Sequence, residues 1–442
     1  MLCYKDIKIK DEKLDLTFKQ LLNIKDSRLF FSNQAYQKER VKGKLTNVFY
    51  GVLTYTPKAC ECCGAVNDGT TIIKHSPKPS DIQLLPFQEV STILRLFKQR
   101  FLCKQCHHTF SAQTYYVSKN CYISQPLKFA IAVDLKKKIS MKDIAARYFV
   151  SFKTVERVLD SFYRDYQAKK NYLPKHLLID EFKGTRDCEG KMCFIFSDAE
   201  TGKIIDILDD RRNFKLITFF QRFSLKARQS VQHVVMDMNA AYASMVPKVF
   251  PNATILIDHF HIIQQISRAF NQQRIRTQNR LNKNDSEDGK NYRKLKKYWK
   301  QLLKKHKNLS YEQLKQFPLF RQKFVTESEV VDYLLTIDPV LKVSYDVYQD
   351  LLDAFEEHNA SEFFRLIDHL PSSLERPFIK SLQYLKKHRK AITLSFTQPY
   401  SNGKLEGKNN LIKVIQRIAF GFRTFKHLRK RVLIQQGVLD IQ

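Results

Sequence analysis

Short apolar runs alternate with helical segments between residues 172 and 260. Three of the runs, HLLID, HVVMD and TILID, end in Asp180, Asp237 and Asp258. Runs this short and continuous are typical of buried strands in an α/β sheet. MCFIFSDA and KIIDILDD lie between the first two aspartates and indicate two more strands joined by a turn. Three strands, a helix and two further strands is the order of an RNase H-like mixed sheet, which is the α/β fold class that we expect.

Residues 126–166 show helical spacing of apolar positions in three pieces. Ser140 and Ser151 stand where they can cap the second and third helices. The third helix then turns three polar side chains outward: Lys153, Thr154 and Arg157. This layout favours a helix-turn-helix whose third helix lies in the major groove of DNA. An ordinary three-helix packing unit fits the same pattern.

The remaining segments give the chain a four-part organisation. Residues 1–54 mix short apolar clusters with lysine without clean periodicity, so we treat them as a lead-in. Residues 262–395 have helical period and almost no strand signal, which indicates a large helical block. The expected boundaries are a lead-in over 1–54, a cysteine module over 55–120, a helix-turn-helix domain over 121–172 and the α/β domain over 173–442.

Charge points to a polyanionic partner. The chain has 442 residues, of which 76 are Lys or Arg and 44 are Asp or Glu, so its formal net charge is +32. Such an excess opposes compaction unless a polyanion neutralises it, and double-stranded DNA is the leading candidate. A membrane surface is the rival partner, but no run approaches 18 apolar residues and the first residues lack a signal-peptide core. We therefore expect a soluble, cytoplasmic protein.

Paired cysteines predict a zinc ribbon over residues 55–120. Nine cysteines without an export signal indicate a reducing compartment, where thiols bind metal or lie buried. Two Cys-x2-Cys pairs have the spacing of knuckles that wrap a structural zinc ion with four thiolates: Cys60, Cys63, Cys103 and Cys106. Cys62 and His107 are neighbouring candidates for the same ligand set. A disulfide or buried thiols are the alternatives.

The strand-end aspartates are candidates for a catalytic metal site. In an RNase H-like sheet the first and fourth strands are neighbours, about 4.8 Å apart, so Asp180 and Asp237 can share a metal ion. Asp258 follows the fifth strand, one place farther away, and we give it a supporting role. His261 lies three residues later at a strand-to-helix corner, where it can support the site or simply make a corner hydrogen bond.

A helix near the C-terminus has two contrasting faces. Leu405, Ile412, Ile415 and Ala419 form an apolar face after a capping Asn402. The opposite face carries one carboxylate among an amide and cations: Glu406, Asn410, Lys413 and Arg417. Taken alone, this pattern describes a solvated helix face. Beside a DNA-binding front half it predicts that Asn410 supports a site and that Lys413 and Arg417 contact DNA.

Several sequence words resemble the ISL-three (ISL3) family of bacterial insertion-sequence transposases, within the DDE superfamily. They are LLIDEF, VVMDMNAAYASMVPKVFPNA, LIDHFHIIQQ and SNGKLEGKNN with KVIQRIAFGFRTF, and their order and spacing also agree. The resemblance runs from about residue 55 to the C-terminus. It implies that Asp180, Asp237 and Glu406 are the three catalytic acids of an RNase H-like domain with a helical insertion. The cysteine-containing stretch RDCEGKMCF and the first 50 residues depart from the family pattern.

Three carboxylates suit two-metal chemistry on DNA. Two Mg²⁺ or Mn²⁺ ions can activate the attacking oxygen and stabilise the leaving oxygen of a phosphodiester. The resulting hypothesis is a transposase that binds the terminal inverted repeats of its element and joins them to target DNA. Because two ends must meet, a homo-oligomer is expected. The alternatives are a zinc-ribbon and helix-turn-helix regulator without catalysis, and a metal-dependent DNA nuclease that cuts without joining.

Overall fold

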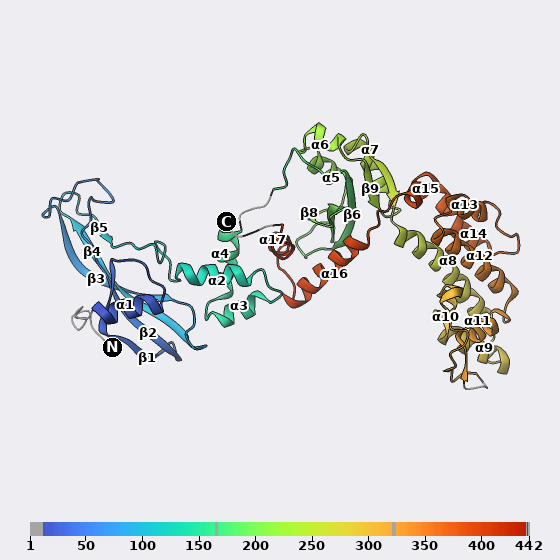
Figure 1. Ribbon diagram of the computed structural model, residues 1–442, viewed down its shortest axis with the longest axis horizontal. Coiled ribbons are helices and arrows are strands. Elements are labelled where there is room, and N and C mark those ends of the chain that lie inside the picture. Colours follow the sequence, from blue (N-terminus) through green and yellow to red (C-terminus); the bar gives the residue numbers. More distant parts are fainter. Residues whose placement is uncertain (1–11, 164–166, 321–323, 439, 441–442) are drawn as a thin grey trace. The chain divides into compact units, whose positions relative to one another are not determined.

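The computed structural model describes residues 12–163, 167–320, 324–438 and 440, and the chain forms two compact units (Figure 1). The division does not follow the sequence in one cut, because two C-terminal segments belong with the N-terminal part. Unit 1 contains Met1–Tyr166, Val414–Phe422 and Lys426–Gln442, and unit 2 contains Gln167–Lys413 and Arg423–Phe425.

Unit 1 begins with one sheet that includes residues from both the expected lead-in and the cysteine module. The strand order is β1-β2-β4-β3, with β5 paired to β4, and β2 runs parallel to β4 from Thr46 opposite Ser91 to Leu53 opposite Lys98. The elements are α1 (Glu12–Leu21), β1 (Leu29–Val41), β2 (Lys44–Leu53), β3 (Ile72–Gln83), β4 (Ser91–Cys103) and β5 (Thr109–Ser111).

The predicted boundary at residue 54 is therefore wrong as a boundary between folded units. Alternate residues of β2 face two different cores, with Phe49 and Leu53 on one side and Val48 and Tyr50 on the other. A strand that is buried on both faces lacks the apolar-polar alternation by which an isolated strand is recognised. This is why residues 44–53 show no clean period.

The three helices predicted over residues 126–166 are confirmed as α2 (Gln125–Asp134), α3 (Met141–Arg147) and α4 (Phe152–Phe162). Ser140 Oγ accepts a hydrogen bond from Asp143 N at 3.0 Å, and Ser151 Oγ accepts one from Thr154 N at 3.1 Å, so both predicted caps are present. The inner face of α4 is formed by Val155, Val158 and Leu159, followed by buried Tyr163.

A fourth helix, α17 (Phe425–Gln435), packs with this group, although residues up to 442 were expected in the α/β domain. Lys430 Nζ lies 2.7 Å from Asp160 Oδ1 on α4. Arg431, 3% exposed, donates to the carbonyl oxygens of Leu135 and Ile139, and burial lowers its pKa to about 10. These carbonyls follow the end of α2, where a helix leaves acceptors without internal partners. The correction follows from tertiary contacts that periodicity does not encode.

Unit 2 contains the predicted RNase H-like sheet. Its strand order is β10-β9-β6-β7-β8, with β6 parallel to β9 and antiparallel to β7. The first and fourth strands of the domain are therefore neighbours, as expected. The strands are β6 (His176–Lys183), β7 (Met192–Asp198), β8 (Ile204–Leu208), β9 (His233–Met236) and β10 (Thr254–Ile257).

The two faces of this sheet have different cover. Leu177 and Ile179 of β6 pack in one core with residues of α5 (Asn213–Phe220) and α7 (Ala240–Val249). Successive side chains of a strand point to opposite faces, so Asp180 lies on the other face. The segment that reaches Asp180 there is α16 (Gly403–Ile418), which follows the helical insertion.

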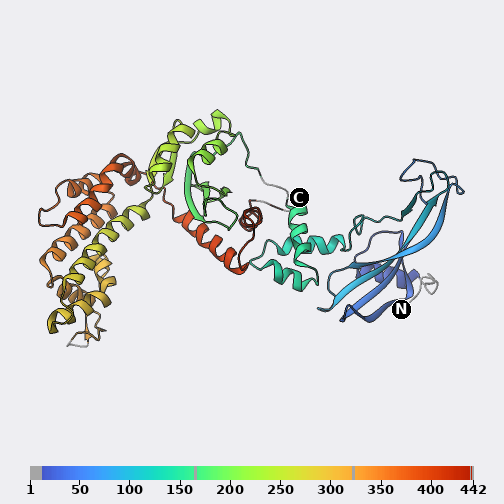
Figure 2. The same ribbon diagram turned by 180° about the vertical axis from the view of Figure 1, so that it is seen from behind.

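The insertion predicted over residues 262–395 is confirmed as helical. Its helices gather around one apolar core in which α8 packs against α12 and α14 (Figures 1 and 2). Among the described residues, no helix is both long and apolar enough to cross a membrane. The α-helices are α8 (His259–Arg280), α9 (Ser286–Lys297), α10 (Trp299–Leu303), α11 (Glu327–Leu335), α12 (Pro339–Glu356), α13 (Ala360–Asp368), α14 (Arg376–Gln383) and α15 (Arg389–Thr397).

Candidate functional site

The four predicted cysteines form a closed cluster in unit 1. Their sulfur atoms all lie within 4.8 Å of one another, with 3.6 Å between Cys60 and Cys106 and 3.8 Å between Cys63 and Cys103. A tetrahedral zinc ion with Zn–S bonds of about 2.3 Å holds its sulfurs about 3.8 Å apart. The cluster therefore fits a structural zinc ion, with no position left for water or substrate.

Both knuckles of the cluster turn in the same way. Gly64 follows the first pair and His107 follows the second, and both have left-handed backbone, with φ of 75° and 55°. Backbone N–H groups of Cys63 and Cys62 face Cys60 Sγ and lower the pKa of this thiol to about 7, which favours the metal-binding thiolate. Cys62 and His107 lie outside the cluster, so His107 serves the turn.

The aspartates of unit 2 lie in one row across three strands. The register pairs Leu178 with Val235 between β6 and β9, and continuing it by two residues aligns Asp180 with Asp237. Continuing the register of β9 and β10 by one residue past Met236 and Ile257 aligns Asp237 with Asp258. The apolar pattern predicted that Asp180 ends its strand. This prediction is wrong, because β6 continues to Lys183 in pairing with β7.

Asp180 is half-buried and lies on the face of the sheet that α16 reaches. Burial is the main influence on the Asp180 carboxyl group and raises its pKa to about 6. The backbone N–H of Glu181 and the charge of His261 lower this pKa, whereas the charge of Asp237 raises it. Asp180 Oδ1 accepts from Glu181 N at 2.7 Å, and Oδ2 accepts from Asn409 Nδ2 at 2.7 Å. Asp237 and His261 are thus close enough to act electrostatically on Asp180.

Asp258 fastens the start of α16. It is 2% exposed, and its Oδ1 accepts a hydrogen bond from Asn402 N at 2.9 Å. The Asn402 side-chain Nδ2 donates to Ile179 O at 3.3 Å, and the backbone carbonyl of Asn402 accepts from Glu406 N at 2.8 Å. His261 Nε2 lies 4.0 Å from Asp258 Oδ2. The buried carboxylate therefore connects β10 to the helix that carries Glu406.

The two predicted faces of α16 are present. Leu405, Ile412 and Ile415 are buried, whereas the predicted polar face is exposed: Glu406, Asn410, Lys413 and Arg417. The residue that α16 presents to Asp180 is Asn409, not Glu406 or Asn410. Within the described ranges, the cysteines are the one group of three or more Cys, His, Asp or Glu residues gathered within 4.8 Å. The structure brings Asp180 and Asp237 together and leaves Glu406 on the open side of the helix.

The sequence interpretation missed Asn409 and the full part played by Asn402. Both are buried, at 7% and 4% exposed, on the face that also carries Leu405 and Ile412. The spacing 402, 405, 409, 412 is the signal that could have found them, since polar residues in an apolar stripe require internal partners.

The predicted DNA-reading side chains of α4 lie at its outer surface. Lys153 and Arg157 are exposed, and Thr154 is half-buried. Lys153 Nζ lies 2.6 Å from Glu156 Oε2 within the same helix, and Thr154 Oγ1 lies 3.0 Å from the capping Ser151 Oγ. The first turn of α4 is thus ordered by its own contacts and available from solvent.

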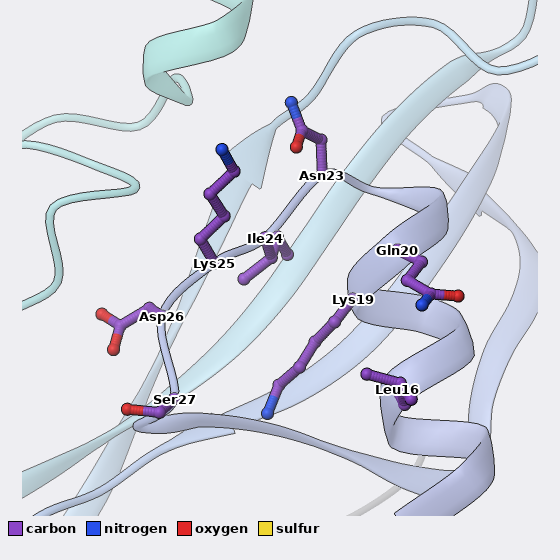
Figure 3. A pocket seen from close by; sticks show the side chains of 8 residues that line it. All are labelled: Leu16, Lys19, Gln20, Asn23, Ile24, Lys25, Asp26 and Ser27. Atoms are coloured by element: carbon purple, nitrogen blue, oxygen red, sulfur yellow. The ribbon is translucent and has the colours of Figure 1, made fainter.

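A pocket of about 440 Å³ lies elsewhere, between α1 and the loop after it (Figure 3). Lys19, Lys25 and Asp26 provide its charged lining. Lys19 already pairs with Asp15 at 2.8 Å, and Asp26 pairs with Arg28 at 2.9 Å. None of the predicted site residues lines this pocket, so it does not compete with the acid row as the candidate site.

Two family models match the chain. The model of the transposase family ISL3 matches residues 177–432, which is more than half of the chain and includes the acid row and α16. The model described as the zinc finger of the transposases of IS204, IS1001, IS1096 and IS1165 matches residues 56–106, which include all four clustered cysteines. The two matches follow each other in the order predicted from the sequence words.

Individual relatives agree over different lengths. The transposase for insertion sequence element IS1001 of Bordetella parapertussis is 24% identical over 406 residues, 88% of this chain and 92% of that protein. A Lactococcus lactis subsp. lactis protein named ATP-dependent protease is 39% identical over 119 residues, 26% of this chain and 36% of that protein. An uncharacterized protein in transposable element ISH50 of Halobacterium salinarum is 34% identical over 85 residues, covering 19% of this chain and 29% of that protein. The chain spans about a third of the Lactococcus and Halobacterium proteins and nearly all of the Bordetella transposase. Because the family model matches more than half of its length, the chain belongs to the ISL3 family of transposases.

Proposed function

We propose that this protein is a DNA transposase that binds the ends of an insertion sequence and performs strand cleavage and strand transfer with two divalent metal ions. Asp180, Asp237 and Glu406 are the proposed metal ligands, with Mg²⁺ or Mn²⁺ as the ion. The cysteine cluster holds a separate, structural zinc ion. Because its substrate is double-stranded DNA, we place the working protein in the cytoplasm, at the nucleoid.

The observation that carries this proposal is the parallel register of β6 and β9, which aligns Asp180 with Asp237 when it is continued by two residues past Leu178 and Val235. Their Cα atoms are expected about 5 Å apart, a spacing at which two carboxylates can share one cation. Both carboxylates are half-buried, where two like charges repel each other more than in open solvent, and a divalent cation would offset this repulsion. A regulator that only binds DNA has no need of such a pair.

Oxygen ligands in an open arrangement suit Mg²⁺ or Mn²⁺ better than zinc. When bound, such ions polarise the attacking oxygen and the leaving oxygen of a phosphodiester. The residues of the chain contribute position: Glu181 N and Asn409 orient Asp180, and Asn239 N holds Asp237 Oδ1 at 3.1 Å. Glu406 is exposed on the first turn of α16, where it is accessible to both ion and DNA.

DNA contacts are proposed on two helices. Lys153, Thr154 and Arg157 on α4 would read or grip the element end in the major groove. Lys413 and Arg417 continue the Glu406 face of α16 about two and three turns farther on, so they can neutralise phosphates next to the reacting strand. The reaction joins two element ends to one target, which calls for a homo-oligomer in the working complex.

The test is cleavage and strand transfer on a labelled duplex that carries the element end, with Mg²⁺ or Mn²⁺. Asp180→Asn, Asp237→Asn and Glu406→Gln should each lower the cleavage rate by about a thousandfold or more while DNA binding and folding persist, because each removes a ligand charge. Glu200→Gln removes an exposed carboxylate at the other end of the sheet and serves as the matched control.

The outcomes separate the candidate functions. DNA binding without cleavage in either metal would identify a regulator. Cleavage without joining would identify a nuclease. Wild-type rates in all three ligand variants would overturn the assignment of the acids.

A further inference from the structure

Both carboxylate oxygens of Asp180 are held by hydrogen bonds from different parts of unit 2. Oδ1 accepts from Glu181 N in its own strand, and Oδ2 accepts from Asn409 Nδ2 in α16, each at 2.7 Å. Two donors at fixed positions leave the carboxyl group one orientation about its Cβ–Cγ bond. The orientation of Asp180 therefore depends on the position of α16.

Asn409 is placed where packing alone favours an apolar residue. It is 7% exposed and lies in the stripe between Leu405 and Ile412, which are 0% and 1% exposed. Its Oδ1 is buried with no hydrogen-bond partner. A buried acceptor without a donor costs about 1–3 kcal/mol. A leucine would avoid this cost, so the packing of α16 does not explain the asparagine.

Asn409 also follows Glu406 by three residues, so the two side chains lie about one helical turn apart. Three hydrogen bonds fasten this part of α16: Asn402 N to Asp258, Asn402 Nδ2 to Ile179 O, and Asn409 to Asp180. The first two fix where the helix begins. The third fixes its rotation about its own axis, and this rotation determines where Glu406 points.

We infer that Asn409 is a positioning residue for the metal site: it orients Asp180 and sets the rotation of α16 that presents Glu406. This inference rests on the proposed function. It assigns to Asn409 the supporting role that the sequence pattern gave to Asn410, whose side chain is exposed and lies 3.5 Å from Lys413 Nζ.

The experiment compares Asn409→Leu with Asn410→Leu in the full-length protein. The second variant makes the same substitution one residue away, on the exposed face. Four quantities are measured: the thermal unfolding midpoint, affinity for the element end, cleavage rate at saturating Mg²⁺, and the Mg²⁺ concentration for half-maximal rate. Asn409→Asp, which keeps the shape but replaces the amide donor with a carboxylate, provides a second variant if Asn409→Leu does not fold.

Asn409→Leu should change the unfolding midpoint little, because it removes an acceptor without a partner together with the hydrogen bond to Asp180, and it should keep the DNA affinity. Its cleavage rate should fall 10- to 100-fold or its half-maximal Mg²⁺ concentration should rise by a similar factor, the usual range for losing a group that orients a metal ligand. Asn409→Asp should lose at least as much, and Asn410→Leu should lose clearly less than Asn409→Leu, because the Asn410 side chain does not contact Asp180. Equal rates and equal Mg²⁺ dependence for Asn409→Leu and Asn410→Leu would overturn the inference.

Asp180→Asn, run in parallel, separates this inference from the proposed function. If Asp180→Asn cleaves like wild type, the proposed function fails. If Asp180→Asn is inactive while both leucine variants behave like wild type, the proposed function stands and the role of Asn409 is refuted.

Discussion

The cysteine cluster of unit 1 and the acid row of unit 2 are built in opposite ways. The cluster takes its four sulfurs from two knuckles that flank β3 and β4, and all four are gathered within 4.8 Å. The row takes its aspartates from the sheet, and the proposed third metal ligand, Glu406, comes from a helix 169 positions after Asp237. One site is closed by local turns, and the other is open and assembled over a long range.

This difference matches the chemistry expected of each site. A structural zinc site has all its coordination positions filled by protein, so the ion stabilises the fold and takes no part in a reaction. A site that binds DNA and two cations must leave positions open, and its geometry depends on supports such as Asp258 and Asn409. Substitutions in the first site should therefore act on folding, and substitutions around the second should act on rate.

The largest effect on stability is expected from Cys103→Ser. Cys103 is fully buried at the end of β4, and losing one thiolate should release the zinc ion, whose binding contributes on the order of 10 kcal/mol in small zinc domains. Zinc analysis should fall from one ion per chain to nearly none, and hydrogen exchange in β3 and β4 should accelerate.

Cys62→Ser is the matched control in the same knuckle, because Cys62 is exposed and lies outside the cluster. It should retain zinc and wild-type exchange. Zinc loss in Cys62→Ser but not in Cys103→Ser would show that the ligand set is wrong.

An intermediate effect is expected from Asp258→Ala. The change leaves the buried Asn402 N–H without its acceptor, which should lower the stability of unit 2 by about 1–3 kcal/mol and slow cleavage by displacing the start of α16. Denaturant unfolding and cleavage rates test this.

Asp258→Asn keeps an oxygen acceptor and should lose much less than Asp258→Ala. If both variants lose activity equally while folding normally, the Asp258 charge binds a cation, and its role as an anchor for α16 is wrong.

A smaller effect on stability is expected from pH, through two histidines at the start of β6 and β9. His176 Nδ1 and His233 Nδ1 lie 2.8 Å apart, and burial lowers the pKa of both rings, although Glu200 raises that of His176. The folded protein therefore takes up protons on these rings at lower pH than the unfolded chain, whose imidazoles have a pKa of about 6.5. The stability of unit 2 should therefore be complete above pH 6.5 and fall as the pH drops below it.

Unfolding of unit 2, followed by hydrogen exchange in β6 and β9 between pH 7.5 and 5.5, measures this trend. The His176→Asn and His233→Asn double variant removes both titrating rings and should show a shallower fall. An equally steep fall in the double variant would assign the pH dependence to other groups.

The smallest effect is expected from His107→Gly. His107 has φ of 55°, and a residue with a side chain is strained there, whereas glycine is not. The substitution should keep zinc and raise stability by up to about 1 kcal/mol. Gly64→Ala, at the matching position of the first knuckle, should destabilise by a similar amount. A destabilised, zinc-poor His107→Gly would make His107 more than a turn residue.

The sheet topology, the knuckles and the helical insertion could be predicted because each is encoded locally. Short apolar runs ending in aspartate gave the strands of unit 2, and serine caps gave the starts of α3 and α4. The partner of a strand and the destination of a helix depend on contacts far away in the chain. The pairing of β2 with β4 and the packing of α17 beside α4 are both of this kind, and both were missed.

The candidate site shows the same limit at the level of single residues. Helical spacing separated the buried and exposed faces of α16 correctly, but it favoured Asn410 as the supporting amide because Asn410 shares the face of Glu406. Asn409 lies on the buried face and contacts Asp180 only because α16 packs against β6. The partner of a buried amide follows from tertiary structure.

The central claim is that Asp180, Asp237 and Glu406 together hold two divalent cations. The most direct test is a crystal structure of the full-length protein with its element end and Mn²⁺, in which anomalous scattering locates each ion. We predict two Mn²⁺ ions about 4 Å apart beside Asp180 and Asp237, with the Glu406 carboxylate bound to one of them. Mn²⁺ absent from the two aspartates, or bound there with Glu406 remote from both ions, would contradict the account.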